Sequence, residues 1–323
     1  MKLDVYDRKL LYYLDINSRA TLGELAKKIR LSKNAVHHRI KNLVRMGIIR
    51  EFYSVINTKK LGYSYFKVYF RLQNTTESIE KEIVNYLVNK VPSLWVNSWE
   101  GRYDLMAGIL AKDIDEFYNM INNINNKFRK YIQSYDIFIV VYAPHFKKNY
   151  LLEQARQQDK IEEFGGKTET IEIDEIDSKI LRELAKNSRI QVVELAEKLN
   201  STIDIIRYRL KKLQEKGIIQ GFRIMIDYTK IGYQLYKVLV TTQNLNQDIE
   251  KEIIQYCLSQ KNIVDVIIKG VGLWNIELQI DAKNAQEFHE IFKNFKNNFS
   301  SIIKNHETLL MIEEFKLNYF PFA

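Results

Sequence analysis

The sequence SKNAVHHRIKNLVRMG, residues 32–47, decides how the rest of the chain is interpreted. Ser32 is a good helix N-cap, because its hydroxyl accepts a hydrogen bond from an unpaired backbone amide one turn on. Val36, Ile40 and Leu43 fall on one narrow apolar stripe of a helix. A glycine follows the last turn, where a left-handed residue commonly ends a helix. The stretch is therefore predicted to be a short helix with one buried face.

The opposite face of this predicted helix carries basic, amide and imidazole side chains and no acidic residue. A short helix with long hydrogen-bond donors on its free face suits the DNA major groove. A solvated basic surface helix is the alternative when the helix is considered alone. The DNA-contacting residues predicted from this copy are Ser32, Lys33, Asn34, His37, His38, Arg39, Lys41, Asn42 and Arg45.

The chain repeats itself at an offset of 170 residues. The triplet Asn-Ser-Arg at 17–19 returns at 187–189, and Gly-Ile-Ile at 47–49 returns at 217–219. Self-similarity of this kind marks duplicated structural units. We therefore expect two copies of one two-part unit.

In the first part of each copy, two short helical patterns are followed by a tight turn and the basic helix, which is the helix-turn-helix order. The apolar and polar residues after it are typical of a strand or wing. The second part reads strand, helix, strand, strand, helix, strand, the ferredoxin-like pattern. The open face of such a sheet must be covered, so the two copies should dock as an intramolecular pseudo-dimer. The predicted fold is α+β. Winged helix-turn-helix domains are expected at 1–63 and 173–233, and ferredoxin-like domains at 64–150 and 234–323. The polar linker at 151–172 is expected to begin as a helix and has too few apolar residues for a core of its own.

The two basic helices differ at their leading ends. In the first copy, Asn34 could read adenine and Lys33 guanine. In the second copy Asp204 stands there, and a carboxylate is unfavourable in a phosphate-rich groove. We expect the first copy to carry most of the sequence specificity, and the DNA sites to be asymmetric. The predicted contacts of the second copy are Arg207, Tyr208, Arg209, Lys211 and Lys212.

Composition fits this interpretation. The formal charge of +9 favours a polyanionic partner, and the single cysteine fits a reducing cytoplasm. Apolar runs are too short for a membrane span. His37 and His38 are adjacent on a helix and point apart, so no metal site is expected, and no cofactor motif is found.

The first unit carries a combined motif at Asp4, Asp7, Leu10, Leu11, 17–19, 24–26, Leu31, Ser32, Val36, Arg39, Ile40, Leu43 and 47–49. This motif resembles that of the Lrp/AsnC family, the leucine-responsive, feast-or-famine transcription regulators of bacteria and archaea. The resemblance covers both copies and implies a DNA-binding helix-turn-helix joined to a ferredoxin-like domain that dimerises and often binds amino acids. Family members usually carry one unit per chain, so the fusion puts octameric assemblies in doubt.

The resemblance also implies an amino-acid effector site at two equivalent loops. An Asp carboxylate in the first loop could hold an ammonium group, whereas Asn replaces it in the second. The alternatives are a strand turn in which Gly supplies an unusual φ and Asp caps a neighbour, and a core or interface role for Trp274. The residues concerned are Gly101, Tyr103, Asp104, Gly272, Trp274 and Asn275.

Two other functions remain open. Siroheme decarboxylases resemble this two-part unit and act on a tetrapyrrole held between ferredoxin-like domains, with histidine and arginine near the loop between strands two and three. The stretches at 94–106 and 263–278 contain no histidine, which favours a regulator over this enzyme. A metabolite sensor without DNA binding is the other alternative.

Overall fold

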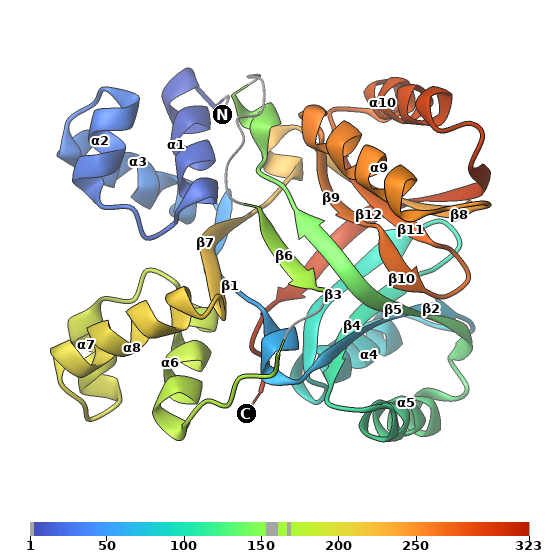
Figure 1. The fold of residues 1–323 in the computed structure, drawn as a ribbon, viewed down its shortest axis with the longest axis horizontal. Coiled ribbons are helices and arrows are strands. Elements are labelled where there is room, and N and C mark those ends of the chain that lie inside the picture. Colours follow the sequence, from blue (N-terminus) through green and yellow to red (C-terminus); the bar gives the residue numbers. More distant parts are fainter. Residues whose placement is uncertain (1–2, 153–160, 167–168, 323) are drawn as a thin grey trace.

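The computed structural model describes residues 3–152, 161–166 and 169–322. Each copy begins with three helices, and Figure 1 shows the two sets on the same side of the molecule. Both helix-turn-helix predictions are confirmed. The helices are α1 (Val5–Ile16), α2 (Leu22–Ile29) and α3 (Lys33–Arg45) in the first copy, and α6 (Glu175–Lys186), α7 (Val192–Lys198) and α8 (Ile203–Glu215) in the second.

Local signals explain where α3 begins and ends. The Ser32 hydroxyl accepts a hydrogen bond from the amide of Ala35 at 3.2 Å, which caps the helix as predicted. The predicted stripe is buried, with Val36 fully inaccessible. Gly47 follows the helix at φ +64°, in the left-handed region that favours glycine.

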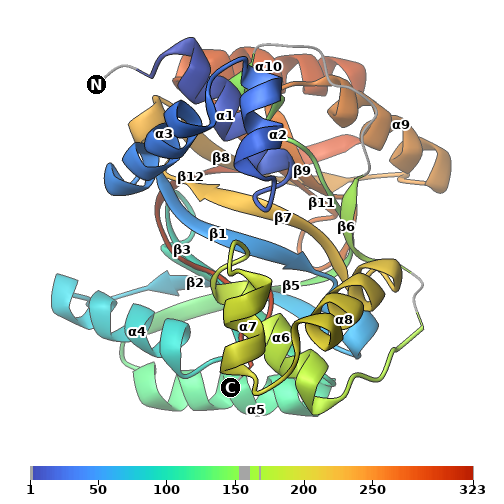
Figure 2. The ribbon, with the colours of Figure 1, turned by 90° about the vertical axis from the view of Figure 1, so that its left-hand side faces the viewer.

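The strands that follow the basic helices form a two-stranded ribbon between the copies. β1 (Ile49–Ile56) pairs antiparallel with β7 (Ile219–Ile226), with Phe52 opposite Ile224. Figure 2 shows this ribbon crossing behind both helix-turn-helix domains. The sequence predicted a strand or wing here, and each of these strands pairs with the corresponding strand of the other copy. The ribbon therefore joins the two reading domains.

The second part of each copy has the predicted ferredoxin-like order. In each sheet two helices lie on the outer face (Figure 1). A short extra strand, β10, is inserted in the second copy. The elements are β2 (Ser64–Leu72), α4 (Glu77–Asn89), β3 (Ser93–Glu100), β4 (Leu105–Ala111), α5 (Ile114–Phe128) and β5 (Ile132–His145), then β8 (Gln234–Thr242), α9 (Gln247–Ser259), β9 (Ile263–Ile267), β10 (Lys269–Val271), β11 (Ile276–Ala282), α10 (Ala285–Asn298) and β12 (Ile303–Leu317).

The two sheets are joined by their longest strands. β12 pairs with β8 along its first half and with β3 along its second. β5 pairs with β2 and then, near its end, with β10 and β9. The predicted docking of the two copies into a pseudo-dimer is confirmed.

The segment between the copies is described only in part. A 3-10 turn, η2 (Asn149–Leu151), follows β5, and the predicted helical start of the linker falls on residues 153–160, which lie outside the described part of the chain. Strand β6 (Glu162–Gly165) then pairs with β5. Phe164 on β6 is 4% exposed and belongs to the central hydrophobic cluster, so this segment contributes to the core. In the described residues, no helix combines the length and apolarity needed to cross a membrane.

Candidate nucleic-acid interface

The free face of α3 is exposed, as a DNA-reading helix requires. Three of the predicted contacts make bonds within the helix: Ser32 caps it, and the Asn42 amide lies 3.1 Å from Nδ1 of His38. The predicted side chains within α3 have no acidic neighbour on the helix. Those that are exposed are Lys33, Asn34, His37, His38, Lys41 and Arg45.

Arg39 and Arg209 differ from the rest of the predicted contacts. The Arg39 guanidinium lies 2.9 Å from Asp4 and 2.7 Å from Asp7, both at the start of α1. Arg209 makes the same pair of bonds to Asp174 and Asp177. These ion pairs attach each basic helix to the first helix of its domain and compete with phosphate for both arginines, whose contact with DNA stays a prediction.

The second basic helix, α8, carries its own neutralising charges. Arg207 lies 3.7 Å from Asp204, and Lys211 lies 3.7 Å from Glu215. α3 and α8 each hold four lysines and arginines, but only α8 also holds acidic residues, two of them. The electrostatic attraction of α8 for a polyanion is therefore weaker. Arg207, Tyr208, Lys211 and Lys212 are exposed.

Each basic helix is held at its C-terminal end by a lysine of the other copy. The Lys230 ammonium donates to the carbonyl oxygen of Met46 at 3.0 Å, and Lys60 donates to that of Lys216 at 2.7 Å. The lysines lie on the 3-10 turns η1 (Thr58–Leu61) and η3 (Thr229–Ile231). A cation at this end of a helix is favourable, because unpaired carbonyl groups gather there.

The repeated Asn-Ser-Arg triplets meet at the pseudo-twofold axis. The Ser18 and Ser188 hydroxyls are 2.6 Å apart. Arg19 donates to the carbonyl oxygen of Ile190 at 3.0 Å, and Arg189 donates to that of Ser18. Together with the ribbon, this junction fixes α3 relative to α8.

The loops predicted to bind an effector lie where the two copies meet. The Tyr103 and Trp274 rings are 6.1 Å apart, and the Asp104 carboxylate accepts a hydrogen bond from the Leu72 amide. Asn275 likewise accepts one from the Thr242 amide. Gly101 has φ +137° and lies against Leu309, whereas Gly272 lies against Ile137 and Phe138. These contacts match the turn, capping and interface alternatives, and effector binding at these loops stays a prediction.

Sequence reasoning missed a group of buried charged residues between the sheets. Lys67 pairs with Glu277, and Lys237 lies 3.8 Å from the same carboxylate. Burial and the neighbouring Lys67 charge lower the pKa of Lys237 to about 8. Lys67 alternates with Phe66 and Val68 in the sequence, a pattern usually assigned to a solvent face, but in the docked pair that face is interior.

His145, one of five histidines scattered along the sequence, has a partner that the sequence did not indicate. It lies at the end of β5, and its Nδ1 is 3.2 Å from the Asp265 carboxylate. Burial by itself raises the pKa of Asp265, but the charge of His145 holds that pKa well below its ordinary value. Among the described residues no group of three or more His, Cys, Asp or Glu could hold a metal.

A third buried group joins α1 to the core. The Asp15 carboxylate lies 2.7 Å from the Arg223 guanidinium and 3.1 Å from the Lys148 ammonium. Arg223 also donates to the carbonyl oxygen of Phe146 at 3.0 Å. A local repeat could have drawn attention to this region: Phe-Lys-x-Asn-Tyr occurs at 146–150 and at 315–319.

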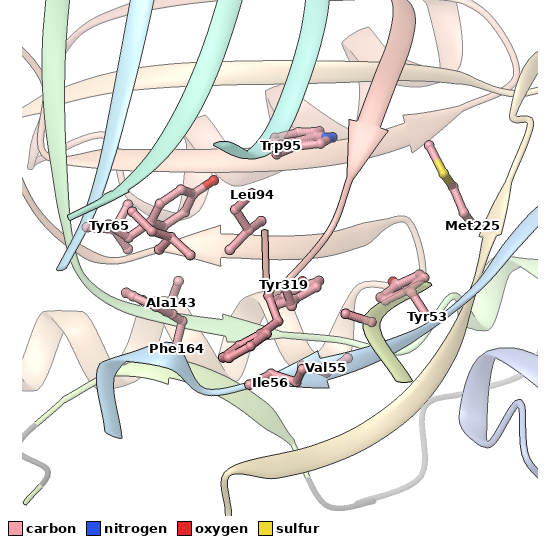
Figure 3. Close-up of a cluster of buried hydrophobic side chains, with 14 of the residues drawn as sticks. Tyr53, Val55, Ile56, Tyr65, Leu94, Trp95, Ala143, Phe164, Met225 and Tyr319 are labelled. Carbon is pink, nitrogen blue, oxygen red and sulfur yellow. The ribbon is translucent and has the colours of Figure 1, made fainter. Parts of the chain in front are cut away.

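A cavity of about 90 Å³ lies beneath the ribbon, among these charged groups. Figure 3 shows Tyr53, Tyr65, Trp95 and Tyr319 near one another in this layer. Tyr53 and Tyr319 stack with centroids 5.7 Å apart. The charged and ionisable residues that line the cavity are Lys67, His145, Lys148, Arg223, Asp265 and Glu314.

Comparisons with known proteins agree with the architecture. A family model for winged helix-turn-helix DNA-binding domains matches residues 3–50 and 173–220. An HTH-type transcriptional regulator of Pyrococcus horikoshii is 34% identical over 133 residues, which cover 39% of this chain and 88% of that protein. Regulator FL11 of Pyrococcus abyssi is 29% identical over 126 residues, covering 39% and 82%.

The structure of the siroheme decarboxylase NirDL matches 98% of this chain and 96% of its own, with a TM-score of 0.62 and 14% identity. At that identity the match shows a common fold over the whole tandem arrangement. The regulator of Pyrococcus horikoshii, by contrast, matches in sequence over nearly its full length with a single unit. The chain belongs to the winged helix-turn-helix transcriptional regulators of the Lrp/AsnC type, with two units in tandem.

Proposed function

We propose that this chain is a sequence-specific regulator that binds double-stranded DNA with α3 and α8 together. The observation that carries the proposal is the exposed, acid-free face of α3, held by the Asn-Ser-Arg junction and the ribbon in a fixed relation to α8. Figure 2 shows both helix-turn-helix domains on one side of the molecule. Two reading helices on one side can contact successive parts of one DNA site. Such a protein would act in the cytoplasm.

The two helices contribute unequally in this proposal. Asn34 is exposed and has no ion-pair or hydrogen-bond partner among the described residues, so its amide is available for a base edge. Arg207 has Asp204 beside it, which lowers its net attraction for phosphate. The favoured DNA site is therefore asymmetric, with its stronger half under α3.

The test compares matched variants on a site found by genome-wide binding mapping. Asn34→Ala should cost about 1–3 kcal/mol of binding free energy and relax specificity at one base, whereas Arg207→Ala should cost less than about 1 kcal/mol and affect all sequences alike. Fluorescence anisotropy at two or more salt concentrations measures both. Equal losses on a site with two identical halves would contradict the unequal assignment.

An amino-acid effector at the Gly101 and Gly272 loops is part of the same proposal. What supports it is the meeting of the two loops at the interface, through Tyr103 and Trp274. A ligand there would touch both copies and could change their relation.

We favour a regulator over an enzyme. The whole-chain match to a siroheme decarboxylase shows fold alone, and that enzyme has also been solved with an iron-uroporphyrin III analogue. The central cavity here, about 90 Å³, is well below the roughly 300–1,000 Å³ of sites for drug-sized ligands. This size suits a small molecule and disfavours a tetrapyrrole.

A further inference from the structure

A surface groove leads toward the central cavity. It lies between the start of β1, the end of β7 and strands β8 and β12, and has a volume of about 360 Å³. Glu314 and Tyr228 line both the groove and the cavity. A molecule that enters from the groove therefore meets the cavity at Glu314.

The groove is acidic in a protein whose formal charge is +9. Its charged lining residues are Arg50, Asp227, Glu313 and Glu314, three carboxylates and one guanidinium. Asp227 is 3.6 Å from Lys230, which offsets its charge. Two glutamates and one arginine remain, so the groove attracts cations.

Glu314 is the buried member of this set. It is 7% exposed, and its Oε1 accepts a hydrogen bond from Nε1 of Trp95 at 2.7 Å. Within the described residues no lysine, arginine or histidine nitrogen lies within ion-pair distance of this carboxylate. Burial raises the pKa of Glu314 to about 7, although the charges of Arg50 and Lys148 act in the opposite direction. A buried carboxylate without an ion-pair partner is unfavourable, so a cationic group placed in direct contact with it would be stabilising.

A second unpaired polar group lies on the same layer. Asn97 is directly opposite Glu314 in the β3–β12 ladder, and directly opposite residues share a face of the sheet. Asn97 is fully buried, and neither its side-chain nitrogen nor its oxygen has a hydrogen-bond partner in the part of the chain that is described. Buried amides are normally satisfied, but Asn97 lines neither the groove nor the cavity, so Glu314 is the group that a ligand would meet.

The cationic residues of the cavity are less suited to recognise a ligand. Lys67 already pairs with Glu277, and Lys148 and Arg223 both pair with Asp15. An anionic ligand would have to compete with these carboxylates. Glu314 is the carboxylate without an ion-pair partner among the described residues of the cavity lining. The surrounding rings of Tyr53, Tyr65, Trp95 and Tyr319 can contact an apolar chain or a cation.

We propose that the groove and cavity bind a small molecule carrying an ammonium group, which pairs with Glu314 while the remainder of the ligand lies among the aromatic rings. This site is separate from the Gly101 and Gly272 loops. It does not depend on DNA binding, so failure of one proposal leaves the other intact.

The test is calorimetric titration of the full chain, without DNA, with three probes of equal length: n-butylamine, 1-butanol and butyrate. The wild type should bind butylamine and show no comparable heat with the alcohol or the acid. Glu314→Gln should weaken butylamine binding about tenfold or more, because the charged partner is lost. Glu290→Gln, which changes an exposed glutamate on α10 that lines neither the groove nor the cavity, is the control and should leave binding nearly unchanged.

The glutamine variant retains the shape of the side chain and removes a charge that burial disfavours, so it should fold. Thermal unfolding confirms this before titration. Equal binding by wild type and Glu314→Gln, tighter binding of butyrate than of butylamine, or no binding of any probe would each overturn the proposal.

Discussion

In the first copy, α1 is joined to the core through the buried Asp15–Arg223–Lys148 group, whereas the equivalent positions of the second copy carry no charge. At the offset of the repeat, Asp15 corresponds to Ala185 and Arg223 to Tyr53. Tyr53 stacks on Tyr319 of the C-terminal segment. Two domains with the same backbone arrangement are thus attached by an ion cluster in one case and by aromatic rings in the other. Duplication within one chain has let the two junctions diverge.

Breaking the ion cluster should give the largest effect. Asp15→Ala removes the ion-pair partner of Lys148 and leaves Arg223 with Glu162 alone, 3.6 Å away, and should reduce the free energy of unfolding by about 3–5 kcal/mol. Burial alone would raise the pKa of Asp15, but Arg223 and Lys148 hold it well below its ordinary 3.8. The stabilisation is therefore complete above that pH and is lost as the pH falls further. Denaturant unfolding at neutral and acid pH measures both.

The control replaces the charged residues of the first junction with the uncharged residues found at the second. Asp15→Ala and Arg223→Tyr introduce the residues found at Ala185 and Tyr53, the counterparts at the offset of 170, and Lys148→Leu introduces that of Leu317, its counterpart in the Phe-Lys-x-Asn-Tyr repeat. This triple variant should be more stable than Asp15→Ala alone and should have lost the acid dependence. A triple variant less stable than the single one would show that the two junctions are not interchangeable.

The aromatic junction should be less sensitive. Tyr53→Leu keeps an apolar side chain but removes the stack on Tyr319, and should cost about 1–2 kcal/mol with little dependence on acid pH. The comparison with Asp15→Ala is made by urea unfolding under the same conditions. A loss as large as that of Asp15→Ala would contradict the view that the charged junction is the more sensitive one.

The crossed lysines should give the smallest effect on stability. Lys230→Met and Lys60→Met each remove one cation from the end of a basic helix of the other copy, at a cost of about 0.3–1 kcal/mol. Because α3 is proposed to carry more of the DNA affinity, Lys230→Met should weaken DNA binding more than Lys60→Met. Anisotropy with the two variants measures the difference, and the opposite order would assign the stronger reading helix to the second copy.

Local sequence signals were sufficient for the helices. Ser32 caps α3, Thr21 and Glu24 form a reciprocal cap on α2, and the apolar stripes are buried as their spacing predicted. These features depend on residues within one or two turns. The ferredoxin-like order was predicted for the same reason.

Contacts across the copies could not be predicted in this way. Lys67 pairs with Glu277, 210 residues further along the chain, and no periodicity near either residue indicates the other. The pairing of β1 with β7 and the burial of Phe164 are likewise consequences of docking. Arg39 was assigned to DNA because its helix is basic, but its partners Asp4 and Asp7 lie on α1. Short-range patterns therefore predicted the helices and their buried stripes, whereas the contacts between the two copies depend on long-range pairing.

One chain runs through β6 from the first copy to the second. This covalent connection determines how DNA occupancy depends on the concentration of the protein. A regulator built from separate single units must assemble before two reading helices can act together, and dilution opposes that step. Here both helices are present at a constant effective concentration. Occupancy of a two-part DNA site should then rise in simple proportion to the number of chains at low concentration, without an assembly threshold. The inequality between α3 and α8 is also permanent, because neither half can exchange its partner for another.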